Sequence, residues 1–166
     1  MTKKLDINNY SINKFHIGSP KKTKIGLNLT INYDTDNFSV QTPVCKLVSI
    51  DCEDKSRCVI SFTISKNFQY FQFFLALEEK IKQDCNNKYI DKQRYISSIK
   101  KYENSHIEMS IKLNTKTVLF DKTKEPISRY SLRKKDKVIL LLETKGIWID
   151  EVTYTMKWNA IQIVKL

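Results

Sequence analysis

Residues 132–149 read LRKKDKVILLLETKGIWI, and residues 152–166 read VTYTMKWNAIQIVKL. The first stretch contains an almost continuous apolar run at 138–142, which is typical of a central strand. Gly146 and Asp150 bracket a short apolar segment, and apolar and polar residues then alternate toward the end of the chain. This pattern predicts strand, turn and strand, and it favours a β-rich fold.

Alternation with a period of two also marks the earlier part of the chain. Residues 25–33 alternate apolar and polar side chains, and residues 38–42 continue the pattern after a turn of Asp and Asn. Further strands are expected at 58–64, 107–113 and 117–120. Residues 25–33 and 38–42 together predict an early hairpin of strand, turn and strand.

One segment, residues 67–84, changes to helical spacing. Its apolar residues recur every three or four positions, and Asn67 is placed to act as the N-cap. We expect its phenylalanines to pack in the core, and we expect residues 89–102 to be helical or irregular. About seven to nine short strands and one solid helix predict a mostly β, α+β fold, built as a barrel or sandwich with an inserted helix.

Length and composition are those of a globular protein. The 166 residues are 41% hydrophobic and 11% aromatic, which predicts one folded domain over residues 1–166. The N-terminus holds no apolar stretch of signal-peptide length, and no run approaches the roughly 18 apolar residues that span a bilayer. We therefore expect an intracellular protein that is not secreted and has no membrane partner.

Residue types that carry catalysis or bind metals form no recognisable pattern. The four cysteines contain no Cys-x-x-Cys pair, and the two histidines lie far from them in sequence. The chain has no glycine-rich phosphate loop, no Gly-x-Ser-x-Gly and no acidic cluster suited to magnesium. We expect reduced thiols, no catalytic residues, no metal and no cofactor.

Positive charge is the strongest signal of a binding function. The formal net charge is +11, which favours encounter with polyanions without distinguishing DNA, RNA, acidic proteins and anionic membranes. Three basic runs stand beside rings or at strand edges: Lys21, Lys22 and Lys24; Lys100, Lys101 and Tyr102; and Arg129, Tyr130, Arg133, Lys134 and Lys135. Lysine and arginine neutralise phosphates, and rings stack on bases with about 1–3 kcal/mol each. Any one of these runs could equally be a solvated loop.

The C-terminal alternation leaves one question open. Tyr154, Met156 and Trp158 share one face of the predicted strand, and Lys157 lies on the other. If the rings are in the core, Lys157 is the exposed contact. If their face is an open groove, Tyr154 and Trp158 stack bases.

Several motifs follow one another along the chain: INY at 31–33, SVQTP at 39–43, the phenylalanine-rich helix at 68–77, KGIW at 145–148 and YTMKW at 154–158. Their order and spacing resemble the single-stranded DNA-binding proteins of nucleocytoplasmic large DNA viruses, which are related to phage single-stranded DNA-binding proteins. The motifs extend over nearly the whole chain.

The resemblance implies an OB-like five-stranded barrel with additional short strands that coats single-stranded DNA during viral DNA replication, recombination or repair. It implies a setting in the host cytoplasm (viral factory) or nucleus. The residues that match the motifs are Tyr33, Gln41, Thr42, Trp148, Lys157 and Trp158. The candidate nucleic-acid contacts are the residues of the three basic runs together with Tyr33, Gln41, Trp148, Tyr154, Lys157 and Trp158.

Two other functions fit the same sequence. An RNA-binding module would use the same charges and rings, and a contact to the 2′-hydroxyl would distinguish it. A structural virion protein or scaffold would instead use exposed strand edges for protein contacts, and a homodimer is one such arrangement.

Overall fold

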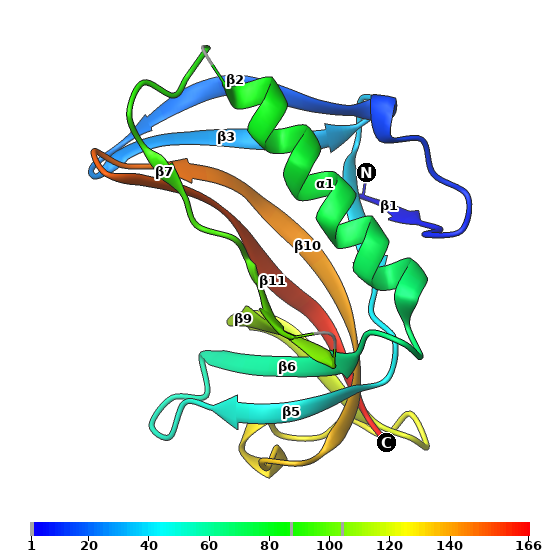
Figure 1. The fold of residues 1–166 in the computed structure, drawn as a ribbon. Coiled ribbons are helices and arrows are strands. Elements are labelled where there is room, and N and C mark those ends of the chain that lie inside the picture. Colours follow the sequence, from blue (N-terminus) through cyan, green and yellow to red (C-terminus); the bar gives the residue numbers. More distant parts are fainter. Residues whose placement is uncertain (1, 87, 104) are drawn as a thin grey trace.

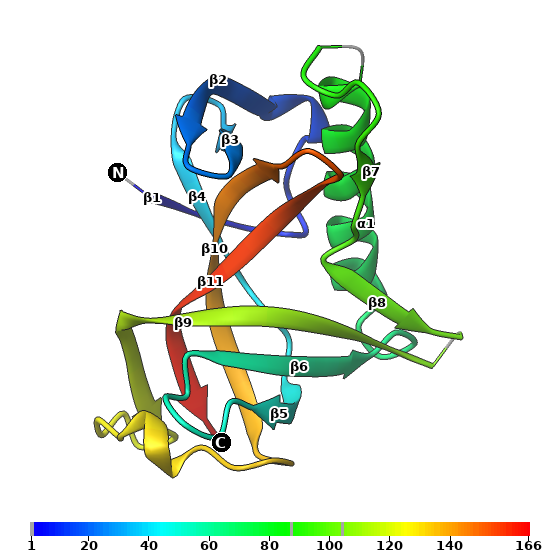
Figure 2. The same cartoon turned by 90° about the vertical axis from the view of Figure 1, so that its left-hand side faces the viewer.

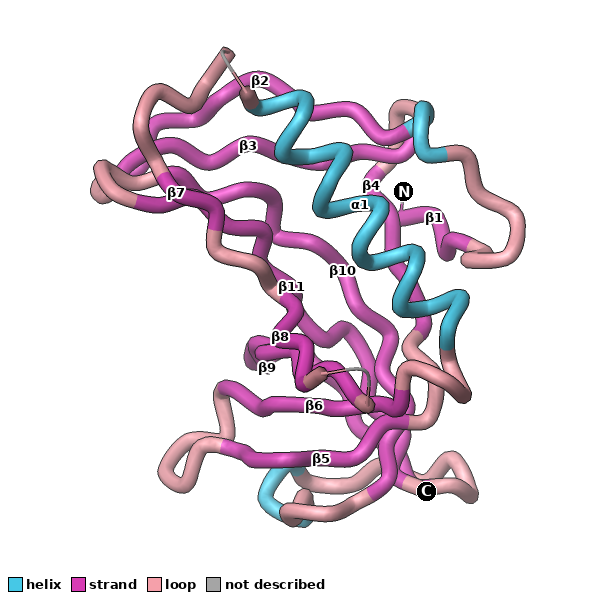
Figure 3. The backbone as a smooth tube through the Cα atoms, in the orientation of Figure 1, coloured by secondary structure: helices cyan, strands magenta, loops and turns pink. Residues whose placement is uncertain are grey.

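The computed structural model describes residues 2–86, 88–103 and 105–166. The helix α1 spans Phe68–Cys85, and the 3-10 turns η1 and η2 span Ile12–Lys14 and Arg129–Ser131 (Figure 3). The strands are β1 (Thr2–Leu5), β2 (Phe15–Thr23), β3 (Gly26–Tyr33), β4 (Asn37–Gln41), β5 (Cys45–Ile50), β6 (Arg57–Thr63), β7 (Arg94–Tyr95), β8 (Ile99–Tyr102), β9 (His106–Asp121), β10 (Lys137–Ile149) and β11 (Thr153–Lys165).

Five of these strands close into a ring (Figure 1). β5 pairs with β6, β6 with β9, β11 with β10 and β10 with β5, all antiparallel, while β9 and β11 pair in parallel. This is the strand order of a five-stranded OB-type barrel. The other six strands lie outside the ring. The prediction of a mostly β fold with an OB-like barrel, extra strands and one helix is confirmed.

β10 is the strand on which the sheet is built. One of its edges pairs with β11 along almost its whole length. The other edge pairs in succession with β5 at 137–138, with β4 at 141–143 and with β3 at 147–149. The predicted early hairpin is therefore wrong in its pairing. β3 and β4 are joined by a short turn, but they lie one after the other along β10 because its edge offers hydrogen bonds to both.

β10 changes partners at a single glycine. Gly146 has a φ of +80°, a conformation that side chains with a Cβ rarely adopt. A Cβ placed there would lie 2.1 Å from the carbonyl oxygen of Leu29 on β3. The pairing with β11 also shifts register between Thr144 and Ile147. The glycine therefore allows β10 to bulge and to approach β3 at the same point.

The helix lies on one side of the part of the sheet that extends above β5 and β6 (Figure 2), and several of its rings pack in the core. Phe73 and Phe74 are completely buried, and the ring of Phe74 meets that of Trp158 edge-on at 5.5 Å. Burial of each such side chain stabilises the fold by about 1.5–3 kcal/mol. The predicted core role is confirmed for Phe71, Phe73 and Phe74, whereas Phe68 at the start of the helix is exposed. Asn67 is the N-cap residue, as predicted, and its carbonyl accepts from the Phe71 amide, but its side chain makes no capping hydrogen bond and donates instead to the carbonyl of Thr63.

Tertiary pairing overrides the local pattern in several places. Residues 89–102 contain the strands β7 and β8, which pair with β11 and β9, instead of a helix. β1, β2 and β5 were not expected. β2 is exposed along most of its length, so its sequence shows no alternation of apolar and polar residues. Pro20 is tolerated within β2 because this strand lies at a sheet edge. In the part of the chain that the structure describes, no helix is long and apolar enough to cross a membrane.

Three of the four thiols are buried. Burial raises the pKa of Cys45 and Cys58 to about 12 and that of Cys85 to about 11. These three side chains are therefore protonated at neutral pH and pack as small apolar groups. Cys52 is exposed.

Within residues 2–86, 88–103 and 105–166, no group of three or more His, Cys, Asp or Glu side chains is placed to hold a metal ion.

We predict that Gly146→Ala lowers the free energy of unfolding by about 2–4 kcal/mol, because the new Cβ meets strand backbone and alanine disfavours this φ. Urea denaturation measures the change. Lys145→Ala, at the exposed neighbouring position, is the matched control and should cost less than about 1 kcal/mol. Equal losses in the two variants would contradict the role of the glycine.

Candidate nucleic-acid interface

A groove of about 750 Å³ crosses the outer surface of the barrel. Its floor is formed by outward-facing residues of β9, β10 and β11, with Asn28 of β3 and Arg57 of β6 at its ends and residues 96–98 at its side. β6 and β9 are the second and third strands of the ring, and this face binds oligonucleotides in many OB-type barrels. We call this site the upper groove.

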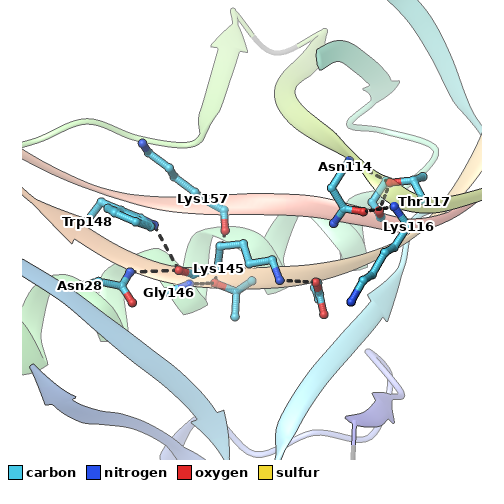
Figure 4. Close-up of polar contacts among 11 residues, drawn as sticks. Asn28, Asn114, Lys116, Thr117, Lys145, Gly146, Trp148 and Lys157 are labelled. Carbon is cyan, nitrogen blue, oxygen red and sulfur yellow. Dashed lines mark hydrogen bonds and ion pairs between the residues drawn. The ribbon is translucent and has the colours of Figure 1, made fainter. Parts of the chain in front are cut away.

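The ring in the upper groove belongs to Trp148, and its orientation is set by hydrogen bonds (Figure 4). The carbonyl of Lys145 accepts from the indole Nε1 of Trp148 at 3.1 Å and from the Nδ2 of Asn28 at 3.1 Å. The ammonium of Lys157 lies 5.1 Å from the centre of the indole ring, within the range of a cation–π contact. A half-exposed ring and a cation thus stand side by side in a fixed geometry.

Positive charge gathers in this groove. Arg57, Lys112, Lys145 and Lys157 line it, and none of its described lining residues is acidic. Lys145 forms an ion pair with Glu143 at 2.7 Å. Arg57 and Lys112 are direct partners in the antiparallel ladder between β6 and β9. Like charges in that position repel each other, so an anion bound between the strands would relieve the repulsion.

The side wall of the groove is held by a buried carboxylate. Glu78 of α1 is only 4% exposed, and its two oxygens accept hydrogen bonds from the Ser97 hydroxyl at 2.6 Å and from the Ser98 amide and hydroxyl at 2.7 Å each. The hydroxyl of Thr155 on β11 donates to the carbonyl of Ile96 at 2.7 Å. The wall is therefore fixed to the helix on one side and to the floor on the other.

Glu78 also affects a neighbouring tyrosine. Burial is the largest cause that raises the pKa of Tyr95 well above its ordinary value, and the negative charge of Glu78 adds to it. The phenol therefore stays neutral throughout the physiological range. Its ring packs at 5.0 Å from that of Tyr154, beneath the groove wall.

Three of the predicted contacts line the upper groove: Trp148, Lys157 and Trp158. Trp158 is only 1% exposed, and two other predicted rings are also buried in the core, Tyr33 at 5% and Tyr154 at 7% exposed. They cannot stack on a base in this conformation, so the open question about the C-terminal face is answered in favour of packing. The hydroxyl of Tyr33 accepts from the Ser11 amide at 3.0 Å, a structural contact.

The remaining predicted residues are dispersed. Lys21 and Lys22 lie on β2, Lys24 in the turn before β3, and Lys100, Lys101 and Tyr102 on β8. Gln41 accepts from the ammonium of Lys4 at 2.8 Å, and Thr42 is buried. Arg133, Lys134 and Lys135 follow η2, whereas Arg129 and Tyr130 lie within η2 and line a second groove. Folding does not bring the basic runs together.

Several groove residues were missed. They are single polar or basic residues at outward positions of strands: Asn28, Arg57, Ser110, Lys112 and Asn159. A search for runs of charge passes over them because each stands alone in the sequence. Alternation identifies the outward positions of β6 and β9, but only the cross-strand register places Arg57 opposite Lys112.

No protein-family model matches this chain, and no curated protein sequence does. Solved structures do resemble it. One is gp2.5, a single-stranded DNA-binding protein encoded by bacteriophage T7, with a TM-score of 0.57 and 6% identity over 77% of this chain and 91% of that one. Another is the single-stranded DNA-binding protein from bacteriophage Enc34 in complex with single-stranded DNA, with a TM-score of 0.52 and 12% identity over 90% and 94% of the two chains.

A C-terminal truncation of the Enc34 protein is also similar, with a TM-score of 0.55 and 10% identity over 92% of this chain and 95% of that one. At these identities the likeness establishes a shared fold. The predicted likeness to phage single-stranded DNA-binding proteins is thus confirmed for the fold.

We predict that Glu78→Ala lowers the free energy of unfolding by about 1–3 kcal/mol, because it removes the buried carboxylate that accepts from the Ser97 hydroxyl and from the amide and hydroxyl of Ser98. Hydrogen exchange at the Ser98 amide should accelerate in the same variant. Glu79→Ala removes an exposed carboxylate one residue away and should change stability by less than about 0.5 kcal/mol. A Ser98 amide that exchanges at the wild-type rate in Glu78→Ala would contradict this anchoring role.

Proposed function

We propose that this protein binds single-stranded DNA without sequence preference, along the upper groove. The observation that carries the proposal is the combination of four basic side chains and the half-exposed Trp148 in a groove that has no acidic lining residue among those described. Phosphates match the cations, and an unpaired base matches the ring.

The absence of sequence preference follows from the type of contact. Cations read the phosphate backbone, which is the same at every position, and a tryptophan ring stacks on any base. Single strands fit better than duplex, because only unpaired bases expose a face to the ring. The likeness of the fold to phage single-stranded DNA-binding proteins supports this choice of partner.

The biological role we propose is protection of single strands during viral DNA replication, recombination or repair inside the host cell. The role is one of binding, with no catalytic step. The viral setting rests on the resemblance of the sequence motifs, and the barrel fold shared with phage proteins is in keeping with it.

Salt dependence tests the electrostatic part of the proposal. For four phosphate contacts at about −0.7 each, the logarithm of affinity for a labelled poly-dT 30-mer should fall with a slope of about −2.8 against the logarithm of salt concentration. Affinity should therefore drop about 50-fold between 50 and 200 mM salt. Fluorescence anisotropy measures both values.

The double variant Arg57→Ala/Lys112→Ala should halve that slope, so that the same salt change costs only about sevenfold. Lys46→Ala/Lys137→Ala removes the same charge from another pair of like-charged ladder partners, between β5 and β10, that does not line the groove, and should leave the slope unchanged. A slope that falls equally in both variants would mean that net charge, and not the groove, determines binding.

The ring makes a separate prediction. Trp148→Ala should weaken binding of poly-dT by roughly 5- to 100-fold at constant salt, since stacking contributes about 1–3 kcal/mol per base. Trp148→Phe keeps a stacking surface and should retain most of the affinity.

Competing oligonucleotides then identify the partner. Duplex DNA should fail to displace poly-dT, and matched RNA should compete less well than DNA. A clear preference for RNA would assign the groove to RNA, and no binding of poly-dT at low salt would overturn the proposal and favour a scaffold role.

A further inference from the structure

We infer that the bound strand continues past Lys112 into a second groove and stacks a base on Tyr130. The inference rests on the proposed function, because it concerns the course of the same strand. Tyr130 then marks the far end of a binding track that begins at Trp148.

The second groove adjoins the upper groove. It has a volume of about 990 Å³ and lies between the bend of β9 and the segment 126–130. Lys112 lines both grooves, so a strand held by Lys112 can enter either one without leaving the protein surface. We call this second site the lower groove.

The ring of Tyr130 is placed to receive a base. It is 57% exposed, which makes it the most exposed of the eight tyrosines. Its backbone is held at both ends, because its amide donates to the Ser128 hydroxyl at 3.2 Å and its carbonyl accepts from the guanidinium of Arg133. One exposed ring is ordinary by itself. Here the backbone that carries the ring is held in place, and the ring lies in a groove that already carries positive charge.

The charges of the lower groove suit a phosphate backbone. Arg129 donates to the carbonyl of Asn114 on the bend of β9, so its cation is held beside the path from Lys112 to Tyr130. Asp54 is the acid at this groove. Hydrogen bonds from Ser56 are the main cause that lowers the Asp54 pKa, and the charge of Arg129 lowers it further, which shows that this carboxylate already has a partial counter-charge.

The bend of β9 around Asn114 and Thr117 is held in place by hydrogen bonds. The hydroxyl of Thr117 donates to the carbonyl of Ala160 on β11 at 2.7 Å and accepts from the Asn114 amide at 3.0 Å. Figure 4 shows this cluster along β11 from the pair of Trp148 and Lys157. The strand β11 therefore positions both the Trp148 end of the track and the bend of β9, which lines the lower groove together with Tyr130.

Other exits from the upper groove are less suitable. The small groove over β3, of about 220 Å³, is lined by Glu143, and its one ring, Phe38, is buried. The tips of the β2–β3 and β10–β11 turns expose Ile25 and Val152, but Asp150 and Glu151 lie beside them and would repel phosphates. The lower groove combines cations with an exposed ring.

The length of the track predicts which oligonucleotides can use it. From Thr155, which pairs with Trp148, to Asn159, which pairs with Lys112, is four residues, and Asn114 is two further along β9. At about 3.3 Å per residue, the part of the track from Trp148 to Asn114 is roughly 20 Å long. A stacked strand advances about 3.4 Å per nucleotide, so a dT3 covers half of this part, whereas a dT12 is long enough to continue to Tyr130.

The experiment measures the affinity of wild type, Tyr130→Ala and Phe68→Ala for a series from dT3 to dT12. Phe68 is the matched control because it is a ring of similar exposure, 53%, on α1. Tyr130→Ala should bind dT12 about fivefold or more weakly and should bind dT3 within twofold of wild type. Tyr130→Phe should bind dT12 like wild type, and Phe68→Ala should match wild type at every length.

The outcomes separate the two proposals. If wild type binds dT12 but Tyr130→Ala loses no more affinity than Phe68→Ala, the track does not reach Tyr130 and only this inference fails. If Tyr130→Ala loses as much on dT3 as on dT12, Tyr130 is not a distal contact and the inference fails as well. If wild type binds no oligonucleotide of the series or poly-dT at low salt, single-stranded DNA binding itself is overturned.

Discussion

The hydrogen-bond ladder of β10 is the interaction on which the rest of this structure depends. Buried backbone groups must be paired, and a strand in the middle of a sheet must find partners on both edges. β10 does so with β11 on one edge and with β5, β4 and β3 in succession on the other. Closure of the barrel and attachment of the outer strands are therefore consequences of a single strand. Its apolar run at 138–142 is long because both faces are largely covered.

The same strand connects the fold to the candidate site. Where β10 bulges at Gly146, the carbonyl of Lys145 accepts from the side chains of Asn28 and Trp148. Bulges often redirect a side chain beside a functional site, and this one fixes the indole at the edge of the upper groove. A conformational requirement met by glycine thus determines where the one half-exposed tryptophan lies. The groove wall is fixed as firmly, through Glu78 and Thr155.

Electrostatics explains why the site differs from the basic runs. A run of lysines along one strand or loop keeps its charges solvated and apart, at little cost to the fold. The pair of Arg57 and Lys112 is different, since the ladder holds the two cations face to face, where they repel each other. An anion bound between these two cations would relieve the repulsion, and this pair lines the upper groove.

The fold class, the inward faces of most strands and the core role of the ring-rich helix could be predicted from residue order alone, because burial imposes a local period of two or 3.6. Alternation placed Tyr154 and Trp158 on one face and Lys157 on the other. The three-dimensional arrangement was needed to show that the first face is core, that Trp148 opens to a groove, and that Arg57 pairs with Lys112. It also decided the strands that lack a pattern, β1, β2, β5, β7 and β8. These features depend on register between strands far apart in the chain, and local periodicity carries no information about register.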